Sequence, residues 1–389
     1  MKKVILAYSG GLDTSCAIPW LNERGYDVIA FLADVGQGED FQKIKARALK
    51  TGASKVYILD LKKEFVDDYV VPAIKASAVY EGKYFLATAL SRPLIAKHQV
   101  LVAQKEKAQA IAHGCTGKGN DQVRFEVTAK ILDPKLEIIA PVRIWEFKTR
   151  DEEFDYLHSK GIKIEITKKS PYSIDKNIWG VSVEAGVLED PDAEPPPDSF
   201  QWTRGADKRN LKERIVRVEF RHGVPVGLDG RRMGGLALIE KLNALASPYG
   251  IGRMDMIENR LVGIKSRETY EAPAATVLLA AHRDLESLVL DRELVHYKEG
   301  VAQKYAELVY YGLWFTPLRR ALDAFVESTQ KKVSGTVRLR LRKYSCQVVG
   351  RSSPHSLYRE SLATYSAKDT FDQKLSKGFI DLWALPYKK

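Results

Sequence analysis

The sequence predicts an α/β domain built on a parallel sheet, followed by an α+β domain and a C-terminal helical arm. Short, nearly continuous apolar runs alternate with helix-length segments through the first part of the chain. This alternation stops near residues 168–171, where longer helices and scattered strands take over. A chain of 389 residues, 45% of them hydrophobic, can form two domains with separate cores. We therefore expect domains at residues 1–167 and 168–362, with the arm at 363–389.

The first domain is predicted from alternating strands and helices. Strands are expected at residues 4–8, 28–33, 56–61, 110–113 and 138–141. Helices are expected at residues 14–24, 41–49 and about 86–107. Gly25 and Gly52 follow the first two helices and act as stop signals. Strands that are apolar on both sides indicate a parallel sheet covered by helices on both faces. In such sheets ligands bind at the carboxyl ends of the strands, so we expect the ligand site there.

The second domain shows a mixed pattern. Its expected elements are strands near 216–220 and 336–341 and helices at about 273–290 and 293–311. Residues 189–198 are acidic and rich in proline, which predicts a surface loop. Near the C-terminus, apolar residues three or four apart predict a short amphipathic helix: Phe371, Leu375, Phe379 and Leu382. Such a helix docks either on its own domain or on a neighbouring subunit.

Composition excludes several classes of protein. The three cysteines, Cys16, Cys115 and Cys346, are far apart, so we expect a reducing compartment and no four-cysteine zinc site. The longest apolar stretch, residues 272–281, is too short to span a bilayer, and the run after Lys3 is too short for a secretory signal. We therefore expect a soluble, cytoplasmic protein without a membrane partner.

The net charge of +11 fits a surface that attracts polyanionic ligands such as ATP. The densest basic run of the chain, residues 338–343, alternates charged and apolar residues, which is typical of a strand with one charged face. We therefore expect no nucleic-acid partner.

A glycine-rich stretch directly after the first strand is the candidate phosphate-binding loop. Its residues are Ala7, Tyr8, Ser9, Gly10, Gly11, Leu12, Asp13, Thr14 and Ser15. The loop opens a helix, so free backbone N–H groups and the helix dipole face a ligand. The spacing is neither GxGxxG nor GxxxxGK[ST]. A glycine pair alone fits an ordinary tight turn, but the added hydroxyl and carboxylate side chains favour phosphate binding.

This SGGxD[ST]S arrangement resembles the pyrophosphate-binding loop of the ATP pyrophosphatase (N-type) superfamily. That resemblance implies cleavage of ATP between the α- and β-phosphates, with AMP and pyrophosphate as products.

Longer motifs narrow the resemblance. They cover residues 81–93 (EGKYFLATALSRP), 113–126 (HGCTGKGNDQVRFE), 182–186 (SVEAG), 257–260 (IENR) and 265–271 (KSRETYE). Together they look like the argininosuccinate synthase family over residues 4–357. The resemblance implies an adenine nucleotide alpha hydrolase-like domain, a synthetase domain and a homotetramer. It also implies ligation of L-citrulline and L-aspartate in arginine biosynthesis, through citrullyl-AMP, with ATP and Mg²⁺.

The resemblance also assigns site residues. The implied citrulline contacts are Tyr84, Thr88, Asn120, Arg124, Ser173, Ser182, Glu258 and Tyr270. The implied aspartate contacts are Thr116, Asn120 and Asp121, and the adenosine contacts are Ala33 and Gly114. Catalytic roles fall to Asp13, Asp121 and Arg124, with Asp121 orienting the aspartate amine or taking its proton. No Mg²⁺ ligand is assigned. This chain has Ala89 where family members often show Ser, so Thr88 either replaces that hydroxyl or the contact is dispensable.

Plainer interpretations exist for single residues. Asn120 and Asp121 could cap a helix that starts near Gln122, and Glu258 and Arg260 could form a surface ion pair. Two other functions are also open. One is a tRNA-modifying enzyme of the same superfamily, although its usual cysteine pair is missing. The other is a non-catalytic nucleotide-binding protein, which would need only the first domain.

Overall fold

The computed structural model describes residues 1–162 and 171–388. Its first part contains a five-stranded parallel sheet in the order β3-β2-β1-β4-β5. The strands are β1 (Lys2–Ala7), β2 (Tyr26–Asp34), β3 (Lys55–Asp60), β4 (Ala110–His113) and β5 (Glu137–Ile139). All five predicted strands are therefore confirmed, with small differences at their ends. The expected domain boundary at 167/168 lies outside the described residues.

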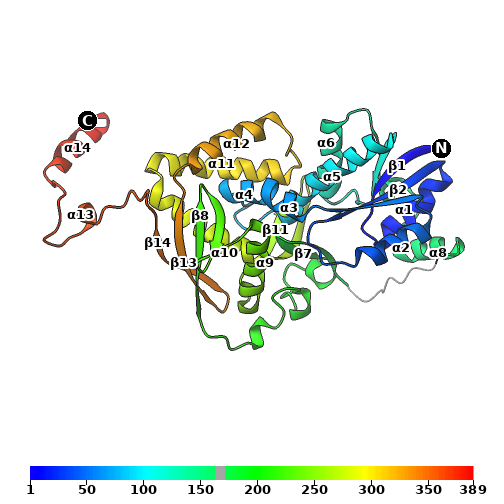
Figure 1. Cartoon of the computed structure of the whole chain (residues 1–389), viewed down its shortest axis with the longest axis horizontal. Helices are drawn as coiled ribbons and strands as arrows, with labels where there is room; N and C mark the ends of the chain where they lie inside the picture. Colours follow the sequence, from blue (N-terminus) through cyan, green and yellow to red (C-terminus); the bar gives the residue numbers. More distant parts are fainter. Residues whose placement is uncertain (163–170, 389) are drawn as a thin grey trace.

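Helices cover both faces of this sheet (Figure 1). They are α1 (Leu12–Glu23), α2 (Phe41–Thr51), α5 (Ala87–Glu106), α6 (Asp121–Leu132), α7 (Pro141–Ile144) and α8 (Arg150–Ser159). Along β1, Ile5 belongs to one hydrophobic core and Val4 and Leu6 to the other. Adjacent residues thus enter opposite cores, which explains why the strand is apolar throughout. Gly52 ends α2 with φ 110°, a left-handed conformation that favours glycine.

The second part holds two antiparallel sheets. The larger, in the order β10-β9-β8-β13-β14, consists of β8 (Arg214–Arg221), β9 (Val224–Leu228), β10 (Arg231–Arg232), β13 (Gly335–Arg342) and β14 (Ser345–Ser352). The smaller, in the order β11-β12-β7-β6, consists of β6 (Ser173–Asn177), β7 (Gly180–Glu184), β11 (Arg253–Asn259) and β12 (Lys265–Glu271). On β13, Val337, Leu339 and Leu341 are buried between more exposed arginines, as the alternation predicted. The smaller sheet was not predicted, because its strands carry many polar residues.

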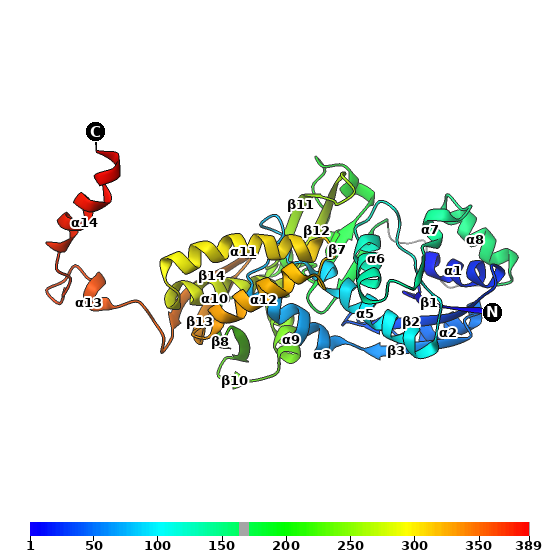
Figure 2. The same cartoon turned by 90° about the horizontal axis from the view of Figure 1, so that it is seen from above.

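Four long helices pack beside these sheets (Figure 2): α9 (Gly235–Ala246), α10 (Pro273–Val289), α11 (Arg292–Tyr310) and α12 (Pro317–Gln330). A missed helical segment follows β3 and contains α3 (Lys62–Phe65), the π-helical turn η1 (Val66–Val70) and α4 (Val71–Lys75). It contacts α9, α10 and α12, so a segment of the first domain is built into the core of the second. Short 3-10 turns complete the chain: η2 (Gly186–Glu189), η3 (Pro197–Ser199), η4 (Ala206–Lys208), η5 (Ser247–Tyr249) and η6 (Leu385–Tyr387).

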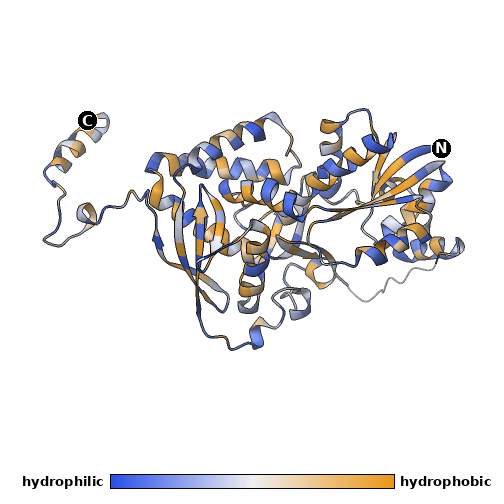
Figure 3. Ribbon diagram, viewed as in Figure 1, coloured by the Kyte–Doolittle hydropathy of each residue, from blue (hydrophilic) through white to orange (hydrophobic). Residues whose placement is uncertain are grey.

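The C-terminal arm stands away from the body in both views (Figures 1 and 2). It carries α13 (Glu360–Ala363) and α14 (Leu375–Trp383), neither of which buries a residue. Phe379 is 62% exposed and Trp383 69% exposed, and Figure 3 shows the apolar colouring of this helix. Docking of the arm on its own domain is therefore not observed. Within the described residues, no helix is long and apolar enough to cross a membrane.

Candidate active site

A cleft of about 1020 Å³ lies between the carboxyl edge of the parallel sheet and the smaller antiparallel sheet. Nineteen of the twenty-one predicted site residues line it: Ala7, Tyr8, Ser9, Gly10, Gly11, Asp13, Thr14, Ala33, Tyr84, Thr88, Gly114, Thr116, Asn120, Asp121, Arg124, Ser173, Ser182, Glu258 and Tyr270. Leu12 and Ser15 are the exceptions. Residues far apart in sequence thus meet in one cleft, although their individual roles remain predictions.

The glycine loop joins β1 to α1 as expected. Gly10 has φ +78°, and a Cβ there would come within 2.9 Å of Ile44 Cγ2, so only glycine fits without strain. Gly11 is the N-cap of α1, and no side chain of the described residues caps it. Among the described residues, the N–H groups of the first turn thus have no capping side chain, and Gly11, Asp13 and Thr14 at this helix end line the cleft, which is the arrangement that binds anions.

The two loop residues that do not line the cleft support the loop instead. Leu12 is buried in the hydrophobic core behind the sheet. The Ser15 hydroxyl lies 2.8 Å from the Gly11 carbonyl oxygen and 3.0 Å from the Tyr8 hydroxyl. Both side chains are used for internal packing, which leaves only backbone groups for the ATP contact predicted at these two positions.

Neighbouring elements hold the loop from two sides. Arg47 of α2 donates to the Gly10 carbonyl oxygen. A Cβ on Gly114, in the loop after β4, would lie 2.7 Å from Thr14 Cγ2. This loop can therefore approach α1 so closely only because residue 114 is glycine. Arg47 was not predicted, because nothing in its sequence neighbourhood shows that α2 lies against the first loop.

Asp13 has a carboxyl neighbour that the sequence did not indicate. Burial and the charge of Asp13 raise the pKa of Glu153, on α8, to about 8. The protonated form of Glu153 is therefore favoured beside Asp13. Within the described residues, no group of three or more His, Cys, Asp or Glu side chains is placed to hold a metal ion.

Asp121 and Arg124 form a charge network with Arg92. The Arg92 Nε lies 2.7 Å from Asp121 Oδ2, and its Nη2 lies 2.8 Å from Asp175 Oδ1. Arg124 Nη1 lies 2.8 Å from Asp121 Oδ1. Burial opposes ionisation of Asp121, but the two arginines outweigh it and hold the pKa of Asp121 below its ordinary value. Arg92 was quoted within a motif but given no role.

The guanidinium of Arg124 is only partly free. Its Nε donates to the Tyr310 carbonyl oxygen at 3.0 Å, and the group lies 4.8 Å from the centre of the Tyr310 ring. With Nη1 on Asp121, the bonds among the described residues leave Nη2 for a ligand carboxylate. A bidentate grip would have to share Nη1 with Asp121.

Asn120 is not a helix cap. It occupies the N-cap position of α6, but its side chain makes no cap hydrogen bond among the described residues. Instead, its Nδ2 donates to the Tyr310 hydroxyl at 2.7 Å, and its Oδ1 accepts from the Leu261 backbone N–H at 2.9 Å. The side chain therefore joins α6 to α11 and to the β11–β12 hairpin.

Glu258 and Arg260 do not form the surface ion pair considered above. Glu258 is buried and accepts from the hydroxyls of Tyr270, at 2.7 Å, and Tyr310, at 2.8 Å. Arg260 pairs with Glu184 and with Glu268. Glu184, Arg260, Glu268 and Tyr310 were given no binding role, because only the fold brings β7, β11, β12 and α11 together.

Tyr84 and Thr88 organise the start of α5. The Tyr84 hydroxyl accepts from the backbone N–H groups of Thr88, at 2.9 Å, and Ala89, at 3.3 Å. Thr88 lines the cleft, whereas Ala89 is fully buried and does not. The Tyr84 ring also stacks on Tyr270, with ring centres 4.3 Å apart.

Two family models match this chain, one in each part of it. The family model described as Arginosuccinate synthase N-terminal HUP domain matches residues 3–163, and the one described as Arginosuccinate synthase C-terminal domain matches residues 172–389. Together they span nearly the whole chain. The chain belongs to the argininosuccinate synthase family.

Curated relatives agree with this assignment. The argininosuccinate synthases of Carboxydothermus hydrogenoformans and Pelotomaculum thermopropionicum are each 54% identical, over 100% of this chain and 97% of their own length. That of Rubrobacter xylanophilus is 53% identical over 100% of this chain and 95% of its own. A solved structure described as a predicted subunit of tRNA methyltransferase from Methanocaldococcus jannaschii covers 39% of this chain and 74% of its own, with 14% identity and a TM-score of 0.27.

The family match confirms the predicted α/β class of the first domain, since that domain is a HUP domain with a parallel sheet.

Cys115 lines the cleft, but burial raises the pKa of its thiol, so it is not an activated nucleophile. Cys16 is buried in the core, and burial raises its pKa as well.

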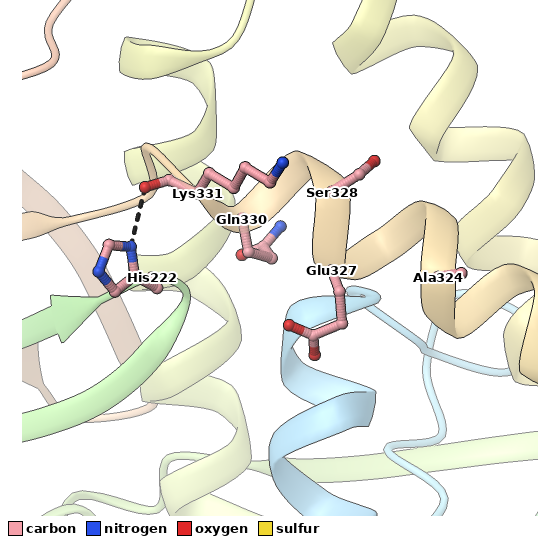
Figure 4. Close-up of a pocket in the computed structure, with 6 residues that line it drawn as sticks. All are labelled: His222, Ala324, Glu327, Ser328, Gln330 and Lys331. Atoms are coloured by element: carbon pink, nitrogen blue, oxygen red, sulfur yellow. Dashed lines mark hydrogen bonds between the residues drawn. The ribbon is translucent and has the colours of Figure 1, made fainter.

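A second hollow, of about 480 Å³, lies between the end of α12 and the turn that joins β8 to β9 (Figure 4). Its lining residues are His222, Ala324, Glu327, Ser328, Gln330 and Lys331. His222 Nδ1 lies 2.8 Å from the Lys331 carbonyl oxygen, and Glu327 pairs with Lys75 at 2.7 Å. Because these polar groups are used by one another, the hollow is a weaker candidate site than the cleft.

Proposed function

We propose that this chain ligates L-citrulline and L-aspartate to argininosuccinate, converting ATP to AMP and pyrophosphate. The observation that carries the proposal is a single cleft that is lined both by an uncapped helix N-terminus and by the Arg92–Asp121–Arg124 network. The first suits a nucleotide phosphate, and the second suits amino-acid head groups. Membership of the argininosuccinate synthase family gives the substrates.

In the first step, the ureido oxygen of citrulline attacks the α-phosphorus of ATP. The new P–O bond gives citrullyl-AMP, and the bond to pyrophosphate breaks. The loop from Ser9 to Thr14 and the first turn of α1 would hold the phosphates through N–H and hydroxyl donors. Ala33 and Gly114 would contact the adenosine. Arg124, through Nη2, would hold the citrulline carboxylate, and Glu258 lines the same cleft.

In the second step, the aspartate amine attacks the activated carbon. A C–N bond forms, the C–O bond to AMP breaks, and the proton of the attacking amine passes to solvent water. Asp121 would orient this amine rather than take its proton, because a carboxylate whose pKa is held low is a weak base. Thr116 and Asn120 would bind the rest of the aspartate. No enzyme nucleophile is needed, so catalysis consists of positioning and charge stabilisation.

A Mg²⁺ ion fits the cleft as part of the nucleotide complex. Mg²⁺ is commonly held by one or two carboxylates together with substrate phosphates, and Asp13 is the carboxylate beside the loop. The ion would neutralise phosphate charge during the transfer.

We also propose a homotetramer in the cytoplasm. The apolar side chains exposed along α14 support assembly through the arm, because an isolated apolar helix is stable in water only with a partner. The three free cysteines support a reducing compartment. The tRNA-modifying and non-catalytic alternatives are not favoured, since both family domains match and polar groups of the second domain line the cleft.

Pyrophosphate release tests the proposal. Purified protein receives Mg-ATP with citrulline and aspartate each supplied or omitted. Argininosuccinate and AMP, formed in equal amounts only when both amino acids are present, are the expected result. Pyrophosphate release with tRNA but not with the amino acids would refute the substrate assignment. An Asp121→Asn variant with near-full activity would refute the role of Asp121.

A further inference from the structure

Glu268, a second carboxyl, lies beside Glu258 in the cleft. It precedes Tyr270 by two residues on β12, so both side chains lie on one face of the sheet. In the β11–β12 pairing, Glu258 lies opposite Ser266 and Glu268 lies opposite Met256, which places the two carboxyls diagonally on that face. Both line the cleft. The family resemblance assigned no role to Glu268.

Glu258 and Glu268 share a single tyrosine hydroxyl, so the two carboxyls do not both ionise. The Tyr270 hydroxyl lies 2.7 Å from Glu258 Oε2 and 2.9 Å from Glu268 Oε2. A tyrosine hydroxyl has one proton, so it donates to only one of them. If both carboxyls were ionised, the other contact would place two oxygen lone pairs together in a buried site. One carboxyl must therefore supply a proton.

The surrounding bonds are all satisfied when Glu268 is the carboxyl that carries it. Tyr310 accepts from Asn120 Nδ2 and donates to Glu258 Oε1 at 2.8 Å, so Glu258 is an acceptor on that oxygen. If Tyr270 donates to the other oxygen of Glu258, the Tyr270 oxygen is left to accept from Glu268. Burial first, and then the charge of Glu258, raise the pKa of Glu268, which agrees with this assignment.

The groups facing Glu268 come from several elements. Glu258 lies on β11, Arg260 follows directly after that strand, and Glu184 lies on β7. Arg260 is the cation in bonding contact with Glu268, at 3.2 Å from Oε1, and it is shared with Glu184. Tyr84, Tyr310 and Arg124 complete the surroundings of the pair. A second cation at this point would therefore favour ionisation of Glu268.

We propose that Glu268 is a specificity residue that holds a proton in the free protein and releases it to solvent when the α-ammonium group of an amino acid binds beside Glu258. The O–H bond of the Glu268 carboxyl breaks, its proton passes to water or buffer, and the ligand ammonium keeps its three protons. The carboxylate formed then pairs with the ammonium. A ligand with a carboxylate but no ammonium would leave the proton in place. The proposal rests on the proposed function in taking citrulline as that amino acid.

Calorimetry on the full-length protein tests the proton release. Citrulline is titrated at neutral pH in phosphate and in Tris, which differ in ionisation enthalpy. Release of about one proton per site is expected, seen as a difference in binding enthalpy between the buffers. 5-Ureidopentanoate, which is citrulline without the amino group, should bind more weakly and release none. Equal binding enthalpies in the two buffers for citrulline would overturn the proposal.

Glu268→Gln is the matched variant. The glutamine amide can donate to the Tyr270 oxygen as the protonated acid does, so the fold and the hydrogen bonds should persist. The variant should bind citrulline without proton release. Glu327→Gln, which changes an exposed glutamate far from the cleft, should release protons as the unmodified protein does. Undiminished release from Glu268→Gln would overturn the assignment to Glu268.

Infrared spectroscopy separates this proposal from the proposed function. The difference spectrum of the ligand-free protein against Glu268→Gln should show the carbonyl band of a protonated carboxylic acid, because the band of protonated Glu153 cancels in it, and the difference spectrum against Glu327→Gln should lack that band. Absence of the band from the first difference spectrum would overturn the proton on Glu268, whatever the ligand is. If the band is present but citrulline does not bind, the proposed substrate fails and the ligand-coupled release fails with it, while the proton assignment stands.

Discussion

Replacing Arg92 with glutamine should weaken the use of aspartate far more than that of citrulline. The change removes the 2.7 Å charge-assisted bond to Asp121 and the 2.8 Å bond to Asp175. A hydrogen bond to a charged group contributes about 1.5–3 kcal/mol. Since the side chains of Arg92 and Asp121 are 17% and 22% exposed, we take the lower value, about 1.5 kcal/mol. That corresponds to roughly a tenfold loss of kcat/KM for aspartate.

The same variant should shift the pH profile. Arg92 helps to keep the pKa of Asp121 below its ordinary value. Without it, that pKa rises, so the activity that needs ionised Asp121 should decline at a higher pH as the solution is acidified. Steady-state rates with aspartate varied, from acid to neutral pH, measure both effects. Arg92→Lys should recover only part of the loss, because lysine does not form the planar fork.

The control is an arginine in an ion pair remote from the cleft. Arg351 of β14 pairs with Asp284 of α10 and is 41% exposed, so Arg351→Gln should change kcat/KM for aspartate less than twofold, because exposed pairs contribute about 0–1 kcal/mol to stability only. An Arg92→Gln enzyme with unchanged kcat/KM for aspartate and an unchanged acid limb would refute the role given to Arg92.

Three further changes test other features. Gly114→Ala places a Cβ 2.7 Å from Thr14 Cγ2, so KM for ATP should rise and thermal stability fall by about 1–3 kcal/mol; unchanged values would contradict this close approach. Tyr310→Phe leaves a buried carboxylate oxygen and a buried amide without their hydroxyl partner, and urea unfolding should show a loss of about 1–3 kcal/mol. Removing residues 364–389 should lower the number of subunits per particle, measured by light scattering, while the ligand-free body stays folded. An unchanged number of subunits would exclude the arm from assembly.

Local sequence predicted the first domain well because its signals are local. Each strand of the parallel sheet is buried on both faces, so it reads as a short apolar run, and Gly52 marks the end of α2 by its left-handed conformation. The second domain was predicted less completely. The strands β6, β7, β11 and β12 carry polar residues that face the cleft, which hides their alternation.

The sequence by itself determined the glycine loop, the family and nineteen of the residues that line the cleft. Most of those residues lie in contiguous motifs, and a contiguous motif can be recognised in the sequence without knowledge of the fold. What only the tertiary structure decided is which side chains share charges and protons. Arg92 with Asp121, Asp13 with Glu153, and Glu268 with Glu258 through Tyr270 are contacts between side chains on different elements or across a strand pair. Their electrostatic effects depend on distance and burial, and both quantities exist only after the chain has folded.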